Sequence, residues 1–232
     1  MVEKRPRTRA TYHHGDLRAA LIAAGVTLAR DGGPHAVVLR EVARAVGVAP
    51  NSAYGHFPTL TALKSAVAQR ARGDMGQAMG AHLDAVEEPA DRAEAAKTYL
   101  REVGRAYVHY AVAEPGLFRT AMGGDPTGIT VPGTSTGDRD DQGRPKPKVF
   151  LERALARLVE AGCLRPADTG RAVMASWAAV HGLSTMFLDL LPQLTAEEQE
   201  TAIGDALDVL VAGLTRTGQA PRSSAAISGS LK

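Results

Sequence analysis

The sequence predicts an all-α protein that begins with a three-helix bundle. Apolar residues recur every three or four positions over most of the chain, which is the period of an amphipathic helix. No segment shows the alternation of apolar and polar residues that marks a half-buried strand. Proline and glycine fall between the periodic segments, where they end helices.

The length of 232 residues and the hydrophobic content of 44% are sufficient for one compact domain or two small ones. The single cysteine, Cys163, has no second cysteine with which to form a disulfide inside the chain. No apolar run approaches the roughly 20 residues that span a bilayer, and no apolar segment follows the basic N-terminus as it would in a signal peptide. We therefore expect a cytoplasmic protein that does not associate with a membrane.

Charge is unevenly distributed along the chain. Residues 1–73 contain 11 lysine and arginine residues and 4 acidic residues, a net charge of +7. The remaining residues contain 16 basic and 21 acidic residues, a net charge of −5, so the overall value of +2 hides the asymmetry. A basic N-terminal third suits a polyanionic partner, although an ordinary solvated surface would give the same count.

Three helices are predicted in the N-terminal third. The first begins at Asp16, a residue suited to cap a helix, and ends at Gly32 and Gly33. The second covers LREVARAV and ends at Gly47, and the third begins at Pro50, which a first helical turn accepts because the missing N–H has no partner there. Two short helices joined by a tight turn that contains glycine form a helix-turn-helix.

Longer helices are predicted in the rest of the chain. Their ranges are about 58–86, 91–113, 115–122, 149–162, 167–191 and 195–216. The last of them begins with a capping box formed by Thr195 and Glu198. The stretch 123–148 is rich in Gly, Pro, Thr and Asp and has no sustained period, which predicts a mobile loop.

The predicted domains follow this order. Residues 1–15 form a basic arm, 16–58 the helix-turn-helix domain, 59–216 a second helical domain that includes the loop, and 217–232 a disordered tail.

The helix-turn-helix predicts a surface for DNA. In this motif the second helix lies in the major groove with its N-terminal residues at the base edges. Four apolar residues are expected to hold the motif against the first helix: Val42, Val46, Val48 and Phe57. The residues left outside are Asn51, Ser52, Gly55 and His56.

The chemistry of these side chains suits DNA. Asn51 can form two hydrogen bonds to adenine, and Ser52 can donate or accept one. Tyr54 and His56 suit phosphate oxygens. The predicted DNA-binding residues are Arg7, Arg9, Arg40, Pro50, Asn51, Ser52, Tyr54, His56 and Lys64. The alternative is a structural corner between two helices, with Tyr54 half-buried and His56 solvated.

The segment LREVARAVGVAPNSAYGHFPTLTALKSAVA resembles the TetR-type one-component transcriptional regulators. The matching residues are Leu39, Ala43, Gly47, Tyr54, His56, Phe57 and Lys64. One position departs from the family pattern, because Gly55 replaces the larger residue often found between the tyrosine and the histidine. A base contact at Gly55 would have to come from the backbone.

A second likeness involves the subgroup whose ligand domain carries a Trp-His-Gly signature. WAAVHGL, YVHYAVAEPGLFRTAM and the opening YHHGDL resemble its characteristic segments. The resemblance implies a homodimer through the last two helices, a palindromic operator in double-stranded DNA and a small-molecule effector bound in the C-terminal domain. The candidate effector-binding residues are Tyr107, Tyr110, Phe118, Met122, Trp177, His181 and Met186, each of which could instead be ordinary core.

Other chemistry has little support in the sequence. His13, His14 and Asp16 could suggest a metal site, but the sequence has no second cluster of ligands at a suitable spacing. Cys163 has no histidine close to it in the sequence. There is no GxSxG, phosphate-binding glycine loop or HExxH, so we expect neither an enzyme nor a cofactor. Two hypotheses remain: a ligand-responsive DNA-binding repressor, and an all-α small-molecule-binding or scaffolding protein that does not read DNA sequence.

Overall fold

The computed structural model describes residues 14–123 and 137–218. The predicted arm up to residue 13, which includes Arg7 and Arg9, lies outside these ranges, as do residues 124–136 of the predicted loop and 219–232 of the predicted tail.

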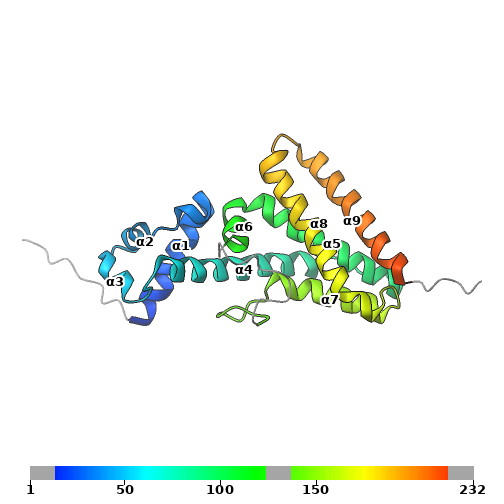
Figure 1. Ribbon diagram of the computed structural model, residues 1–232, viewed down its shortest axis with the longest axis horizontal. Helices are drawn as coiled ribbons and strands as arrows, with labels where there is room; N and C mark the ends of the chain where they lie inside the picture. Colours follow the sequence, from blue (N-terminus) through cyan, green and yellow to red (C-terminus); the bar gives the residue numbers. More distant parts are fainter. Residues whose placement is uncertain (1–13, 124–136, 219–232) are drawn as a thin grey trace, which may run out of the picture. The chain divides into compact units, whose positions relative to one another are not determined.

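The described residues form nine α-helices and confirm the predicted all-α class (Figure 1). The helices are α1 (His14–Ala36), α2 (Leu39–Val46), α3 (Pro50–Tyr54), α4 (Leu60–Asp84), α5 (Arg92–Ala113), α6 (Pro115–Met122), α7 (Pro147–Glu160), α8 (Thr169–Thr185) and α9 (Ala196–Gly218). A short 3₁₀ helix, η1 (Pro166–Asp168), precedes α8, and a π-helical turn, η2 (Met186–Leu190), follows it. No described helix is long and apolar enough to cross a membrane.

The helix ends agree with the sequence in some places and differ in others. Thr195 and Glu198 form the predicted capping box, with the Thr195 N–H donating to Glu198 Oε2 at 2.8 Å and the Glu198 N–H donating to Thr195 Oγ1 at 3.3 Å. α1 begins at His14, so Asp16 lies inside its first turn and not at its cap. Gly33 has φ of 67°, which interrupts the helical backbone where the two glycines were predicted to end it.

The contacts divide the chain into two compact units. The headpiece unit comprises Met1–Gly76 and Ala113–Lys146, and the C-terminal unit comprises Gln77–Val112 and Pro147–Lys232. The contacts therefore group residues 113–146 with the N-terminal helices, whereas the predicted domains follow the order of the sequence. The predicted division into a DNA-binding domain and an effector-binding domain stays a prediction.

The core of the headpiece unit is formed by the apolar faces of α1 to α4. Its most buried large side chains include Leu21, Val37, Val42, Leu63 and Val67, each at most 1% exposed. Gly25 on α1 faces Val67 on α4, and a Cβ at this position would come within 2.6 Å of the Val67 side chain. This close approach fixes α1 against α4, while α2 packs on α1 and α3 packs on α2.

α6 packs closely on α1 within the headpiece unit. A Cβ on Gly116 would overlap the backbone carbonyl oxygens of Ala29 and Arg30, so only glycine fits this contact. Arg30 also pairs with Glu114 at 3.0 Å, and Arg72 on α4 donates to the carbonyl oxygen of Ala121 at 2.6 Å. α6 is thereby attached to both α1 and α4.

Residues 137–146 form a compact turn on α4, although they lie inside the stretch predicted to be a mobile loop. The Asp140 N–H donates to the Arg144 carbonyl at 2.9 Å, and the Asp140 side chain is only 3% exposed. Arg144 pairs with Asp140 and with Asp74 on α4. A Cβ on Gly76 would overlap the carbonyl oxygen of Pro145. This part of the predicted loop is therefore packed.

The C-terminal unit is built on α5. Gly104 admits the side chains of Leu207 from α9 and Val180 from α8, because a Cβ there would lie 2.4 to 3.4 Å from their atoms. Arg101 on α5 pairs with Asp208 on α9 at 2.6 Å. Within this unit α5 thus contacts both of the last two helices.

Candidate nucleic-acid interface and effector site

The turn between α2 and α3 has the geometry that the sequence predicts. Gly47 ends α2 in the left-handed conformation, with φ of 79° and ψ of 26°, which favours glycine. The Val48 N–H donates to the Ala43 carbonyl at 3.0 Å and closes the turn. Pro50 then occupies the first turn of α3, where it removes no helical hydrogen bond.

α3 exposes one face and buries the other. Ala53 and Phe57 are 1% and 2% exposed and anchor the segment in the core of the headpiece unit. Asn51 and Ser52 are exposed, and Tyr54 has 53% of its surface accessible to solvent.

His56 and Gly55 lie in the turn that follows α3. His56 is half-buried, so it is less accessible than the predicted position outside the motif. Its backbone N–H donates to the Ala53 carbonyl at 3.0 Å. Gly55 is exposed and has a right-handed helical backbone, with φ of −63°. Its backbone is therefore accessible from solvent.

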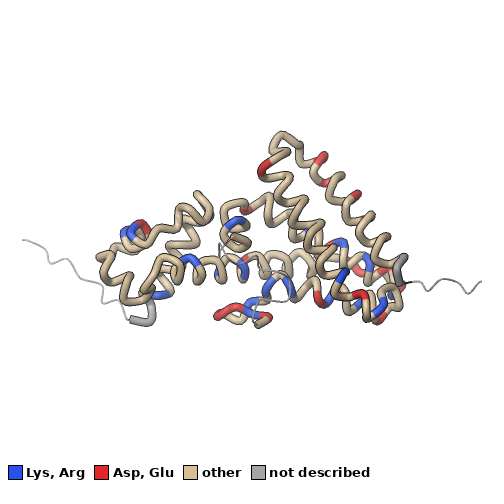
Figure 2. Tube along the Cα trace, viewed as in Figure 1, with Lys and Arg blue, Asp and Glu red and all other residues tan. Residues whose placement is uncertain are grey.

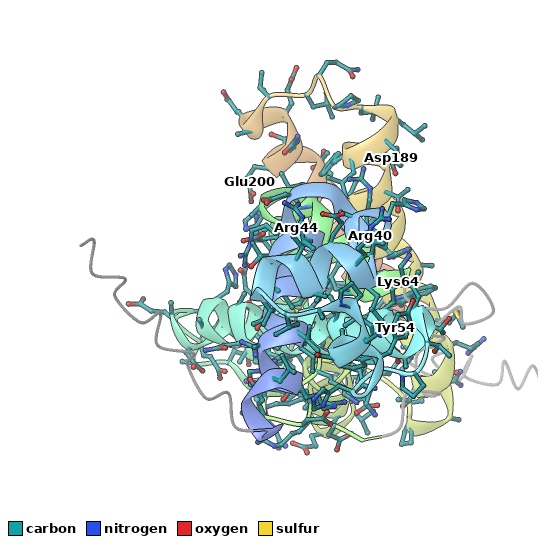
Figure 3. All side chains as sticks on the ribbon, turned by 90° about the vertical axis from the view of Figure 1, so that its left-hand side faces the viewer. Arg40, Arg44, Tyr54, Lys64, Asp189 and Glu200 are labelled. Atoms are coloured by element: carbon teal, nitrogen blue, oxygen red, sulfur yellow. The ribbon has the colours of Figure 1, made fainter. Side chains whose placement is uncertain are left out.

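The predicted cations lie on the same face as Tyr54. Figure 3 shows Arg40, Arg44, Tyr54 and Lys64 on one side of the headpiece unit, on α2, α3 and the start of α4. Arg40 and Arg44 both pair with Glu41, at 3.8 and 2.6 Å, and both signs of charge appear side by side on α2 in Figure 2. The Arg40 charge is therefore partly compensated, an effect that single-residue reasoning missed.

Three of the seven candidate effector residues meet in the C-terminal unit. The Tyr107 hydroxyl and His181 Nδ1 are hydrogen-bonded at 3.1 Å. The Trp177 and His181 rings are stacked, with centroids 4.9 Å apart and an angle of 10° between their planes. Burial raises the pKa of Tyr107, with an opposing hydrogen bond from Trp177, and burial lowers the pKa of His181.

The Tyr107 hydroxyl lies between Trp177 and His181 in a chain of hydrogen bonds. An indole N–H is only a donor, so the Tyr107 oxygen accepts in its hydrogen bond with Trp177. The direction of its hydrogen bond with His181 Nδ1 depends on the His181 tautomer. The three side chains form an ordered polar chain between α5 and α8.

The other four candidate residues are placed differently. Tyr110 is buried on α5, at 8% exposed, and Met186 is 42% exposed on η2. Phe118 and Met122 lie on α6, in the headpiece unit.

Sequence reasoning also missed a buried polar group on α8. Ser176 is 2% exposed, and its Oγ has no hydrogen-bond partner among the described residues. It precedes Trp177 in the chain, but a serine among small residues gave no signal in the sequence.

The other chemistry considered from the sequence gains no support. Within residues 14–123 and 137–218 no group of three His, Cys, Asp or Glu side chains could hold a metal ion. His13 lies outside the described residues, and Cys163 is half-buried with its sulfur 3.8 Å from the Ala161 carbonyl oxygen.

A short, solvent-facing second helix on a tight glycine turn, with cations on the same face, defines a helix-turn-helix DNA-binding protein. Comparison with known families agrees. Residues 21–67 match the family described as "Bacterial regulatory proteins, tetR family", and residues 100–210 match "Tetracyclin repressor-like, C-terminal domain". The chain belongs to the TetR family.

Solved structures show the same fold. A protein of unknown function from Rhodococcus sp. RHA1 has a TM-score of 0.62 and 21% identity, over 89% of this chain and 100% of that one. A variant of TetR from Acinetobacter baumannii AYE, in complex with minocycline, has a TM-score of 0.58 and 18% identity, over 87% and 98%. RolR in complex with resorcinol has a TM-score of 0.55 and 18% identity, over 90% and 95%. No curated protein sequence gives a significant match.

Family membership decides between the two hypotheses. TetR-type regulators are non-enzymatic transcription factors that bind DNA operators, respond to small molecules and form dimers, so the chain is a ligand-responsive transcriptional regulator. The scaffolding alternative does not fit this assignment. The narrower likeness to the Trp-His-Gly subgroup stays a prediction.

Proposed function

We propose that the chain is a homodimeric repressor that binds a palindromic operator in double-stranded DNA and is released by a small-molecule effector. The observation that carries the proposal is the exposed face of α3, with Asn51, Ser52 and Tyr54 in solvent and Ala53 buried beneath them. A helix held in this way can enter the major groove without rearrangement of the headpiece core.

The residues of this face divide into two roles. Asn51 and Ser52, in the first turn of α3, read base edges, and Asn51 pairs with an adenine. Tyr54, His56, Arg40 and Lys64 bind phosphate oxygens, which fixes the position of α3 but carries no sequence information. Pro50 fixes the start of the helix. Arg7 and Arg9 of the basic arm add charge contacts beyond the described residues.

Dimerisation through α8 and α9 would pair two headpieces. The exposed residues of α8 include Met174, Ala175, Ala178 and Gly182, which are small or apolar; exposed Arg171 and Thr185, near the two ends of the helix, are polar. Val209 on α9 is 73% exposed, although it is apolar. Small residues allow the helices of two subunits to approach closely in a four-helix bundle, and a two-fold dimer binds two half-sites about one helical turn apart, or a multiple of that.

The effector is proposed to bind beside the chain formed by Trp177, Tyr107 and His181. This group combines stacked rings with fixed hydrogen bonds, and Ser176 adds a buried hydroxyl that lacks a described partner. Such a mixture of apolar surface and a few oriented polar groups is typical of small-molecule sites. Two structural neighbours, solved with minocycline and with resorcinol, support a small-molecule site in this fold. The remaining candidate residues, Tyr110, Phe118, Met122 and Met186, stay proposals.

An effector acts only if it binds the DNA-free conformation more tightly than the DNA-bound one. The site of action is the cytoplasm, where a bacterial operator lies.

The experiment that tests the proposal is selection from a random-duplex library at two salt concentrations, with fluorescence anisotropy on the recovered sequences. We expect a palindrome with a steep salt dependence. Weak binding without an enriched sequence, by protein shown to be folded and dimeric, would contradict the proposal. A recovered palindrome would then serve to find effectors by their release of the protein.

A further inference from the structure

Arg18 on α1 stacks on an aromatic ring beside the recognition helix. Its guanidinium carbon lies 5.2 Å from the centroid of the Phe57 ring. Arg18 is exposed, whereas Phe57 is only 2% exposed. The Phe57 N–H donates to the Ala53 carbonyl at 2.9 Å, so the ring is fixed to the C-terminal end of α3. The position of the guanidinium is therefore tied to α3.

Arg18 differs from most other cations of the headpiece unit because it has no acidic or carbonyl partner among the described residues. Five of the seven described lysine and arginine residues between 14 and 76 have a protein partner: Arg30 with Glu114, Arg40 and Arg44 with Glu41, Arg70 with Asp74, and Arg72 with the Ala121 carbonyl. Within the described part of the chain, Arg18 and Lys64 have neither a carboxylate nor a carbonyl partner. Both flank the recognition segment, since Lys64 lies in the first two turns of α4.

A guanidinium in this setting is suited to an anion. Arginine stacks on an aromatic face and still directs its N–H groups outward, where they match the geometry of a phosphate. Stacking on Phe57 also restricts the side chain before DNA arrives, which reduces the ordering cost of the contact. A carboxylate partner would have to be displaced first, and Arg18 has none among the described residues.

We propose that Arg18 binds a backbone phosphate of duplex DNA and that Phe57 positions it for this contact. The inference rests on the proposed operator binding and adds a residue on α1 to that interface. The contact would fix the register of α3 in the groove by holding a phosphate at a set position from Asn51 and Ser52. It carries no sequence preference of its own.

The test measures dissociation constants on a short mixed-sequence duplex by fluorescence anisotropy, over about 50 to 200 mM KCl. Arg18→Gln is expected to reduce the slope of log K against log salt by about 0.9, the value for one lost phosphate contact. Arg18→Lys should retain most of the slope, because it keeps the charge. Arg92→Gln is the matched control, since Arg92 is an arginine of the C-terminal unit with 72% of its side chain exposed. It should leave the slope unchanged.

A purely structural role for the stacked pair predicts a different result. In that case Arg18→Gln lowers the thermal midpoint but leaves the salt slope at the wild-type value, and the proposal is overturned. Phe57→Leu separates the two roles further. If the ring positions Arg18, Phe57→Leu weakens DNA binding in the wild-type background and has little further effect on binding in the Arg18→Gln background.

Failure of this inference is distinguishable from failure of the proposed function. If the wild type binds duplex DNA and Lys64→Gln reduces the slope while Arg18→Gln does not, only the assignment of Arg18 is wrong. If the folded wild type does not bind duplex DNA at all, the operator-binding proposal fails and the Arg18 inference fails with it.

Discussion

The hydroxyl of Tyr107 and Nδ1 of His181 lie 3.1 Å apart and join α5 to α8. Burial lowers the pKa of His181, so the folded protein favours its neutral imidazole. A histidine exposed by unfolding, with its ordinary pKa of about 6.5, binds a proton more readily. His181 therefore contributes stability above that ordinary pKa, and the contribution is lost as the pH falls through the lower folded pKa.

We expect the thermal midpoint to fall between about pH 7 and pH 5, and His181→Gln to reduce this pH dependence. Differential scanning fluorimetry over that range measures it. His109, whose pKa is also lowered mainly by burial, should account for part of the dependence that remains. His35→Gln is the control, because His35 is exposed on α1. An unchanged pH dependence in His181→Gln would contradict the assignment.

Asn51 and Lys64 should differ in their effect on DNA binding. Asn51→Ala removes a base contact and should cost about 1–3 kcal/mol on the selected operator while relaxing the preference at one position in each half-site. Lys64→Ala removes a phosphate contact, so it should weaken binding to all duplexes alike and lower the salt slope by about 1. Binding to a panel of single-base operator variants separates the two. Indistinguishable profiles would refute the division between base and phosphate contacts.

Gly116→Ala should loosen α6 from α1. The added methyl group would overlap the carbonyl oxygens of Ala29 and Arg30, which are backbone atoms and cannot turn away as a side chain could. Overpacking of this kind costs about 1–3 kcal/mol or more in the free energy of unfolding, which urea denaturation measures. Gly170→Ala on α8 has no atom within 4 Å of the new methyl and should be neutral or stabilising by up to about 1 kcal/mol. Equal effects of the two substitutions would rule out a tight α1–α6 contact.

Val209→Glu should weaken the homodimer. Val209 is the most exposed large apolar residue on α9, and a carboxylate there would be buried without a partner in the proposed four-helix bundle. We expect the dimer dissociation constant to rise at least about tenfold, which corresponds to about 1.4 kcal/mol. Sedimentation velocity over a concentration series measures it. Val38→Glu, at an exposed valine of the headpiece unit, should leave the dimer intact; a wild-type dimer in Val209→Glu would exclude α9 from the interface.

Local signals in the sequence predicted much of the fold. The helical period, Gly47 with Pro50, and the Thr195–Glu198 box act over a few residues, and the structure confirms the elements they predicted. The exposed position of Asn51 followed from the same period.

Tertiary contacts could not be predicted in this way. The stacking of Arg18 on Phe57 and the packing of Gly116 on α1 join residues far apart in the sequence, so no spacing rule reveals them. The Asp140–Arg144 turn was predicted as loop because its order comes from Asp74 on another helix. Arg40 pairs with Glu41, the next residue in the sequence, but the sequence does not give the side-chain conformations on which this pairing depends.

The grouping of residues 113–146 with the N-terminal helices has a consequence for building hybrid regulators. If the chain were truncated at residue 76, the surfaces of α1 and α4 that α6 and the Asp140–Arg144 turn cover would be exposed. Fusing only the first 76 residues to another ligand-binding domain would therefore give a DNA-binding domain with these surfaces exposed to solvent. A hybrid regulator that keeps the headpiece unit intact must also include the segment from Ala113 to Lys146. The part to be transferred is therefore made of two segments that are not adjacent in the sequence.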